Sequence, residues 1–179
     1  MKPKTQRRLN KKFRFQLFAQ WIIENYEPCR VADIGGGKGL LSYFLNKAGF
    51  QSTVIDPFDQ PLPVKYKDIV LNKRILMDPS EAVPRITTEY AKDMAKDFDL
   101  LISLHAHGCN MMIIEGAAEY DKKFILLPCC VIDEPIDVQK NVNWFESLDI
   151  YAKHLGHDTQ RETLNFKGQA EMIFVNIES

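Results

Sequence analysis

Four glycines and an acid stand at a spacing that suits the binding of a small polar ligand. Residues 33–39 read Asp-Ile-Gly-Gly-Gly-Lys-Gly and follow a short apolar run. A side chain on such a turn would stand between the backbone and a ligand, and a tight strand-to-helix turn often needs a positive φ angle. The residues after Gly39 have helical spacing, so the helix start would offer free N–H groups and the positive end of its dipole. The stretch predicts a strand, a glycine turn and a helix that together hold a polar or anionic ligand.

The spacing of the glycines excludes two common nucleotide-binding loops. A P-loop has Ser or Thr after its lysine, whereas Gly39 follows Lys38. A dinucleotide-binding loop needs G-x-G-x-x-G/A, and the third position counted from Gly35 and Gly37 is Leu40. The pattern present is D-x-G-x-G-x-G. The simpler alternative is a glycine-rich turn that binds no ligand.

A second acid follows Asp33 at a spacing typical of a nucleotide-binding βαβ unit. Residues 51–56 read QSTVID, a β-branched strand that ends at Asp56, 23 residues after Asp33. In a nucleotide-binding βαβ unit, an acid at the end of the second strand accepts hydrogen bonds from ribose hydroxyls. Asp56 is therefore expected to bind a ribose, and a surface aspartate without a ligand is the alternative.

With Asp33, the glycine turn and Asp56 in this arrangement, the chain resembles the class I S-adenosylmethionine-dependent methyltransferases. The resemblance implies S-adenosylmethionine as cofactor, with the turn around its methionine half and the acid close to it. It implies cofactor contacts from the following residues: Asp33, Gly35, Gly36, Gly37, Lys38, Gly39, Asp56, Asp78, Ser103, Leu104 and His105. Asp78 would lie near the adenine, at the end of a third strand formed by residues 69–71 or 75–77.

The rest of the pattern predicts an α/β fold. The apolar runs at residues 98–104 and 124–132 are typical of strands buried on both faces. Two strand-like segments, 160–166 and 171–177, flank Lys-Gly-Gln and predict a C-terminal antiparallel hairpin. Helices are expected at residues 39–48, 86–96, 110–120 and 141–154. The resemblance implies one Rossmann-like domain over residues 1–179, with a seven-stranded sheet of order 3-2-1-4-5-7-6.

Two short motifs carry a narrower resemblance. Residues 104–108 read Leu-His-Ala-His-Gly and residues 128–130 read Pro-Cys-Cys. They are similar to a methyltransferase group in which these strands end Leu-His-Ala-Cys-Gly-Asp and Pro-Cys-Cys, and which includes tRNA ribose 2′-O-methyltransferases. His107 stands where that group has Cys, and Cys109 where it has an acid. The resemblance implies an RNA substrate, tRNA or rRNA.

His105 is the candidate catalytic residue. Methyl transfer from a sulfonium is an in-line displacement, so an enzyme must align donor and acceptor and remove a proton where the acceptor carries one. His105 follows a strand that should end beside the sulfonium, and a histidine can act as a base near neutral pH. The alternative is that His105 bonds the neighbouring strand end and only shapes the pocket. Cys129 is expected on the substrate side.

Histidine and cysteine also suggest zinc, since five such residues follow these two strands: His105, His107, Cys109, Cys129 and Cys130. Alternate residues of a strand share a face, however, so adjacent cysteines should point to opposite faces. Neither segment has C-x₂-C spacing, and a buried free cysteine commonly serves as a small apolar residue. The sequence therefore predicts no metal, while catalytic, metal-binding and structural roles stay open.

Basic residues gather at the N-terminus. Residues 1–14 hold seven Lys and Arg and no acid, which leaves 16 bases against 24 acids in the remainder. A helix over about residues 6–26 is expected, with an apolar stripe away from most of these bases. Such an end suits a polyanion, so RNA binding is assigned to Arg7, Arg8, Lys11, Lys12 and Arg14. A solvated helix start is the alternative.

The composition adds a few limits. No apolar run reaches the length of a membrane span, and the basic N-terminus lacks the apolar core of a signal peptide. A cytoplasmic protein with free thiols and no membrane contact is expected. The sequence as a whole predicts an S-adenosylmethionine-dependent RNA methyltransferase. Alternatives are a protein or small-molecule acceptor, or a non-catalytic cofactor-binding subunit; the loop 57–67, the segment 133–140 or a protein partner could supply recognition.

Overall fold

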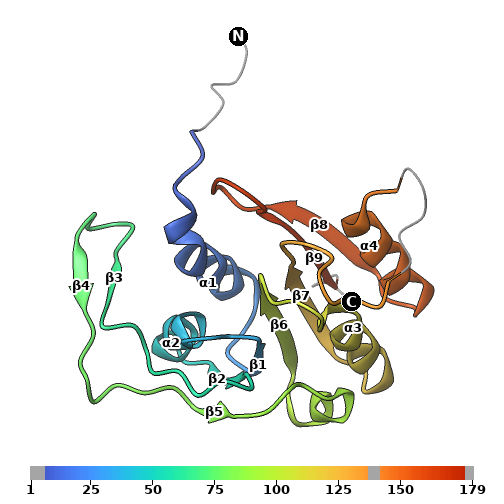
Figure 1. Ribbon diagram of the computed structural model, residues 1–179, viewed down its shortest axis with the longest axis horizontal. Coiled ribbons are helices and arrows are strands. Elements are labelled where there is room, and N and C mark those ends of the chain that lie inside the picture. The colour runs from blue at the N-terminus through green and yellow to red at the C-terminus, as the bar shows by residue number, and fades with distance from the viewer. Residues whose placement is uncertain (1–6, 137–141, 176–179) are drawn as a thin grey trace.

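The structure, a computed structural model, describes residues 7–136 and 142–175 and is built on one seven-stranded sheet (Figure 1). The strands of this sheet lie in the order β5-β2-β1-β6-β7-β9-β8. Counted along the chain within the sheet, that order is 3-2-1-4-5-7-6, which confirms the predicted fold class. Their bounds are β1 Arg30–Ile34, β2 Gln51–Ile55, β5 Arg85–Ile86, β6 Leu100–Leu104, β7 Lys123–Leu127, β8 Thr159–Thr163 and β9 Glu171–Val175.

Strand direction divides the sheet into two parts. Strand β1 pairs in parallel with β2 and β6, and β6 pairs in parallel with β7. Strand β9 runs antiparallel to both β7 and β8, which is the predicted C-terminal hairpin. The parallel strands therefore end along one edge of the sheet, where ligands bind in open α/β folds.

Helices cover both faces of the sheet. On one face, α1 (Arg14–Asn25) and α2 (Leu40–Lys47) pack through Phe18 and Leu41 on alternate residues of the central strands. On the other face lie α3 (Asn110–Glu119), α4 (Trp144–His154) and the short 3₁₀ helix η2 (Lys92–Asp97). All five residues of β6 are buried because both of its faces are covered, and this explains its continuous apolar run.

The third strand of the sheet is not where the sequence placed it. Residues 65–67 and 74–76 form β3 (Lys65–Lys67) and β4 (Arg74–Leu76), a separate antiparallel hairpin. The strand beside β2 is β5, and the helix expected over 86–96 is wrong: Ile86 belongs to β5 and only residues 92–96 are helical, as part of the 3₁₀ helix η2. The Val54 N–H donates to the Pro84 carbonyl (2.9 Å) and the Asp56 N–H to the Ile86 carbonyl (3.3 Å). Two residues are too few to show a periodic pattern, so this strand carries no sequence signal.

The N-terminal helix starts later than predicted. A 3₁₀ turn, η1 (Lys11–Phe13), leads into α1, whereas residues 7–9 are not helical. The Leu9 N–H donates to the Asn165 carbonyl (3.1 Å), and its own carbonyl accepts from the Lys167 N–H (2.9 Å). Asn10 then caps the turn by accepting from the Lys12 N–H (3.1 Å). Bonds to the distant β8–β9 loop thus replace the first helical turn, and residue 6 lies outside the described residues.

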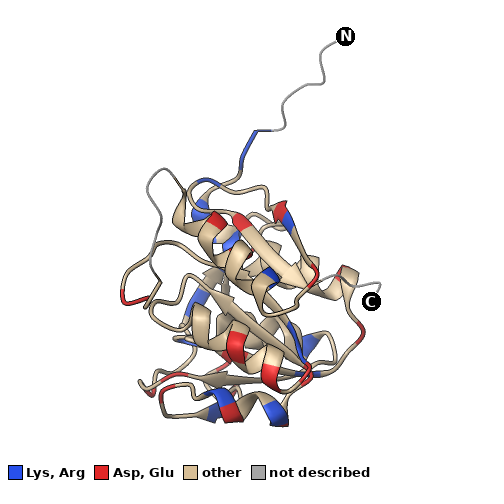
Figure 2. Ribbon diagram, turned by 90° about the vertical axis from the view of Figure 1, so that its right-hand side faces the viewer, with Lys and Arg blue, Asp and Glu red and all other residues tan. Residues whose placement is uncertain are grey.

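Charge and length give two further observations. Figure 2 shows basic colour on the segment that enters the domain from the N-terminal side, where Arg7 and Arg8 are exposed. Within the described residues, no helix combines the length and the apolar character that crossing a bilayer requires.

Candidate functional site

The glycine turn connects β1 to α2 at the edge where the parallel strands end. Gly35 has a φ angle of +66°, and a Cβ there would lie 2.4 Å from Cβ of Ala106 on the neighbouring segment. A Cβ on Gly36 would lie 2.7 Å from the Asp33 carboxyl group. Since real Cβ atoms do not approach so closely, the turn can pack against these neighbours only with glycine.

Gly37 is held from two other strands. Its N–H donates to Oδ2 of Asp56 (2.9 Å), just past β2. Its carbonyl accepts from Nη2 of Arg85 on β5 (2.8 Å), which also donates to the Gln60 carbonyl (2.8 Å). A Cβ on Gly37 would meet no atom within 4 Å, so this position faces open space.

Arg85 is a site residue that the sequence interpretation missed. Its side chain is only 10% exposed, and Asp59 lies 3.6 Å from its Nε. It joins the glycine turn to the loop 57–60, and Asp56 fixes the same loop by accepting from the Phe58 N–H (2.9 Å). No local motif marks Arg85, because its partners are backbone carbonyls distant in sequence.

Asp33 is buried beneath the turn. It is 1% exposed, and its Oδ2 accepts a hydrogen bond from the Ser42 hydroxyl (2.8 Å). Burial raises the pKa of the Asp33 carboxyl group to about 6, because the apolar surroundings disfavour its charged form. A carboxylate this well buried gains from a cationic or hydrogen-bond-donating ligand.

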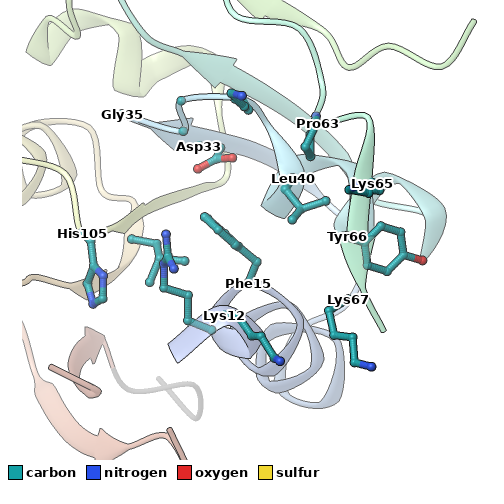
Figure 3. A pocket seen from close by; sticks show the side chains of 15 residues that line it. Lys12, Phe15, Asp33, Gly35, Leu40, Pro63, Lys65, Tyr66, Lys67 and His105 are labelled. Carbon is teal, nitrogen blue, oxygen red and sulfur yellow. The ribbon is translucent and has the colours of Figure 1, made fainter. Parts of the chain in front are cut away.

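A first cavity of about 520 Å³ opens between the glycine turn, the start of α1 and β3 (Figure 3). Asp33 is the one acid among the described residues that line it. The bases that line it are Lys12, Arg14, Lys38, Lys65 and Lys67. Two of them, Lys65 and Lys67, come from β3, which lies within the stretch 57–67 that was expected to be a loop. The alternation Lys65-Tyr66-Lys67 was the sequence signal that could have indicated a strand here. With five basic residues and one acid in the part of its lining that the structure describes, the cavity is strongly basic.

Arg14 lines this cavity and also holds a buried nitrogen without a partner among the described residues. Its Nε is buried and has no hydrogen-bond partner within the described parts of the chain. The guanidinium lies over the Phe15 ring, 4.4 Å from the ring centroid, and Nη1 donates to the Lys11 carbonyl (3.4 Å). Burial lowers the pKa of Arg14.

A second cavity of about 460 Å³ lies across Gly35 and His105, which line both cavities. Asp56, Tyr90 and His107 line the second cavity. It opens beside β1. After β1 the chain first adds β2 and β5 on one side of this strand and then adds β6 and β7 on the other side, so the strand order reverses at β1. Ligands of open α/β sheets bind at such a reversal of strand order, and both volumes suit a small molecule.

His105 stands between the two cavities in a constrained backbone. Its φ angle is +58°, and its N–H donates to the Leu127 carbonyl (2.9 Å). Its Nε2 lies 2.8 Å from the Gln169 carbonyl, which can only accept, so Nε2 carries the proton. Burial lowers the pKa of His105 to about 4. The neutral ring therefore leaves Nδ1 unprotonated and able to accept a hydrogen bond.

The other predicted cofactor residues differ in position. Leu104 and Lys38 line the first cavity, whereas Ser103 is wholly buried and lines neither. Gly39 begins α2 as its N-cap. Asp78 lines neither cavity, because β4, the strand before it, belongs to the separate hairpin and not to the main sheet. The Asp78 side chain is exposed and accepts a hydrogen bond from the Ser80 N–H (2.8 Å).

The predicted substrate residues separate as well. Lys12 and Arg14 line the first cavity, whereas Arg7, Arg8 and Lys11 line neither. Cys129 lies 3.8 Å from the His105 carbonyl, measured from its Sγ. Of the segment 133–140, Asp133 lines the second cavity, and residues 137–140 lie outside the described residues.

The expectation that Cys129 and Cys130 point to opposite faces is wrong. Their Sγ atoms lie 3.4 Å apart, and His107 Nε2 lies 3.0 Å from Cys129 Sγ and 3.2 Å from Cys130 Sγ. Strand β7 ends at Leu127, so the alternation of a strand no longer applies after Pro128.

Comparison with known sequences finds partial relatives. No model of a known protein family matches the chain. It is 31% identical over 104 residues to a Caenorhabditis briggsae protein named probable tRNA (uracil-O(2)-)-methyltransferase. A Caenorhabditis elegans protein of the same name is 31% identical over 106 residues. Each match covers 58% of this chain but only 18% of the relative.

Comparison with solved structures identifies the fold. An S-adenosylmethionine-dependent methyltransferase from Archaeoglobus fulgidus superposes with a TM-score of 0.53 at 16% identity, covering 92% of this chain and 96% of that one. A Burkholderia thailandensis 1,6-didemethyltoxoflavin-N1-methyltransferase, solved with S-adenosylhomocysteine, gives 0.50 at 13% identity, covering 92% and 77%. The chain has the Rossmann-like fold of the class I S-adenosylmethionine-dependent methyltransferases.

Proposed function

We propose that this chain is an S-adenosylmethionine-dependent methyltransferase that acts on RNA. The observation that carries the proposal is the glycine turn held between two carboxyl groups, Asp33 and Asp56, at the reversal of strand order. Gly37 leaves open space where any other residue would project a side chain. This geometry suits a ligand with both a cationic end and a ribose.

The cofactor would bridge the two cavities. Its methionine half would lie on residues 35–39 above Asp33, with Lys38, Leu104 and His105 around it, and Asp56 would accept from its ribose. Each Asp56 oxygen accepts one backbone hydrogen bond and keeps a lone pair for a hydroxyl. Ser103 would support the site from beneath. We leave Asp78 out of this set because it lines neither cavity.

The chemistry asked of the residues is mainly alignment. The bound cofactor would supply a methyl group on a sulfonium, which an acceptor attacks in line. His105 lines both cavities, and its unprotonated Nδ1 would accept a hydrogen bond from a hydroxyl or amine of the acceptor. Since Nε2 is held by the Gln169 carbonyl, the ring has a fixed orientation for this role.

Two observations support RNA as the acceptor. Five basic side chains line the first cavity beside His105, and a strongly basic cavity suits a phosphate backbone. The two sequence relatives are named as tRNA methyltransferases. Arg7, Arg8 and Lys11 would extend the phosphate contacts beyond the cavity, and Cys129 would lie on the acceptor side.

The glycine turn gives the test of cofactor binding. We expect Gly37→Arg to abolish binding of S-adenosylmethionine in isothermal titration, because its side chain would fill the open space above the turn. Gly156→Arg is the matched control: Gly156 also has a positive φ angle (+93°) and no atom within 4 Å of its Cβ position. It should bind as wild type does. Equal loss of binding in both variants, or none in Gly37→Arg, would contradict the proposal.

The buried Asp33 carboxylate should lower the stability of the fold at neutral pH while it supports cofactor binding. Between pH 4 and 6 the folded state holds a proton on Asp33 that the unfolded state releases, so stability falls as the pH rises through this window. Asp33→Asn should therefore raise the free energy of unfolding at pH 7 by about 1–3 kcal/mol, with no gain near pH 4, and should weaken cofactor binding.

Denaturant unfolding at several pH values measures this effect. Asp99→Asn is the control, because the pKa of Asp99 is lowered by its hydrogen bonds to Arg30 and its neutralisation should not stabilise. If Asp33→Asn were less stable than wild type at pH 7, the charged carboxylate of Asp33 would not be destabilising the folded state, and this prediction would be contradicted.

The basic cavity gives a test of the RNA proposal. Replacing Lys12 and Lys65 together by Gln should weaken binding of unmodified tRNA and reduce the salt slope of log K by about 1–2. Replacing Lys92 and Lys96, which lie on η2 outside both cavities, should leave the slope unchanged. Fluorescence anisotropy across a salt series measures both. An identical slope in the two double variants would argue against phosphate contacts in the cavity.

A further inference from the structure

Three potential metal-ligand atoms converge where β6 and β7 end. They are Nε2 of His107 and the Sγ atoms of Cys129 and Cys130, and all three lie within 4.8 Å of one another. The nitrogen is 3.0 Å and 3.2 Å from the two sulfur atoms, which are 3.4 Å apart. The described residues hold no other such group of three or more His, Cys, Asp or Glu side chains.

These separations are close to one face of a zinc tetrahedron. With Zn–S bonds of about 2.3 Å and Zn–N bonds of about 2.0–2.1 Å, tetrahedral angles space two sulfur ligands about 3.8 Å apart and a nitrogen and a sulfur about 3.5 Å apart. The observed triangle would need to widen by only a few tenths of an ångström at each edge. Two cysteines and one histidine also match the soft and borderline ligands that zinc prefers.

The chain after β7 makes this triangle possible. Because β7 ends at Leu127, Pro128 starts an irregular segment in which adjacent cysteines can present both sulfur atoms to one side. His107 comes from the corresponding segment after β6, the parallel neighbour of β7. The cysteines are half-buried and the histidine is exposed, so an ion could enter from solvent.

We propose that His107, Cys129 and Cys130 bind one zinc ion. Binding would release the two thiol protons to solvent, so two thiolates would neutralise the ion while His107 stays neutral and offers the Nε2 lone pair. Three protein ligands leave the fourth position for water or a bound molecule, as in zinc sites that are not purely structural. Since His107 also lines the second cavity, the ion would lie at its rim. It would join the ends of β6 and β7 beside the proposed acceptor position.

Metal content is the first test. Protein expressed without a histidine tag and purified under reducing conditions, without chelators, should contain about one zinc per chain by elemental mass spectrometry. Cys129→Ser, Cys130→Ser and His107→Gln should each lose most of it. Cys29→Ser is the matched control, since Cys29 is a half-buried free cysteine that precedes β1 at the opposite edge of the sheet, and it should keep the zinc.

A second measurement does not depend on whether the variants fold. Cobalt(II) added to metal-free wild-type protein should give a thiolate-to-cobalt charge-transfer band together with the visible bands of a tetrahedral site, and zinc should displace it. Wild type without zinc and without the cobalt band would overturn the proposal. So would a different metal in the purified protein, equal zinc in all variants, or a Cys129–Cys130 disulfide in the reduced preparation.

Discussion

The backbone N–H and carbonyl of Gly37 are the groups on which the site depends. Its N–H is bound by Asp56 from the end of β2, and its carbonyl is bound by Arg85 from β5. The turn after β1 is thus fixed by the two strands next to it in the sheet, and the same two side chains also hold the loop 57–60. Because both cavities are lined by Gly35, the shape of each follows from this arrangement.

The same region contains buried polar groups whose environment is electrostatically unfavourable. Asp33 is buried with hydrogen bonds from Ser42 alone, and Arg14, which lines the first cavity, holds a buried nitrogen without a partner in the described residues. Buried polar groups without full partners reduce stability, and they are common where a ligand completes the hydrogen bonding. His105, in a left-handed backbone conformation between the cavities, is a third instance. Strain that gathers around two adjoining cavities is typical of a functional site.

The sequence predicts those parts of the fold whose signal is local. The apolar runs of β6 and β7, the glycine turn and the C-terminal hairpin all follow from spacing, and the strand order that the family resemblance implies is confirmed. Features set by distant partners could not be predicted this way. Strand β5 has two residues, Arg85 acts through remote carbonyls, and Leu9 pairs with the loop around residue 166 instead of starting the helix.

The basic cavity illustrates how the acceptor side is assembled. Lys12 and Arg14 belong to the N-terminal run that the sequence made conspicuous, but Lys65 and Lys67 come from a hairpin whose position depends on packing of Tyr66 against Phe44, with ring centroids 5.1 Å apart. The cluster of basic residues at the N-terminus therefore indicated only part of the basic cavity lining. Arg7 and Arg8 are exposed but lie outside the cavity, so only a subset of the basic residues lines it.

The central claim is methyl transfer to RNA. The most direct measurement incubates the protein with S-adenosylmethionine labelled in its methyl group and with separated RNA and protein pools from cells that lack the gene. We expect label in the RNA pool with wild-type protein and none with Gly37→Arg. Label confined to protein or small molecules, or no transfer to any pool despite cofactor binding, would contradict it.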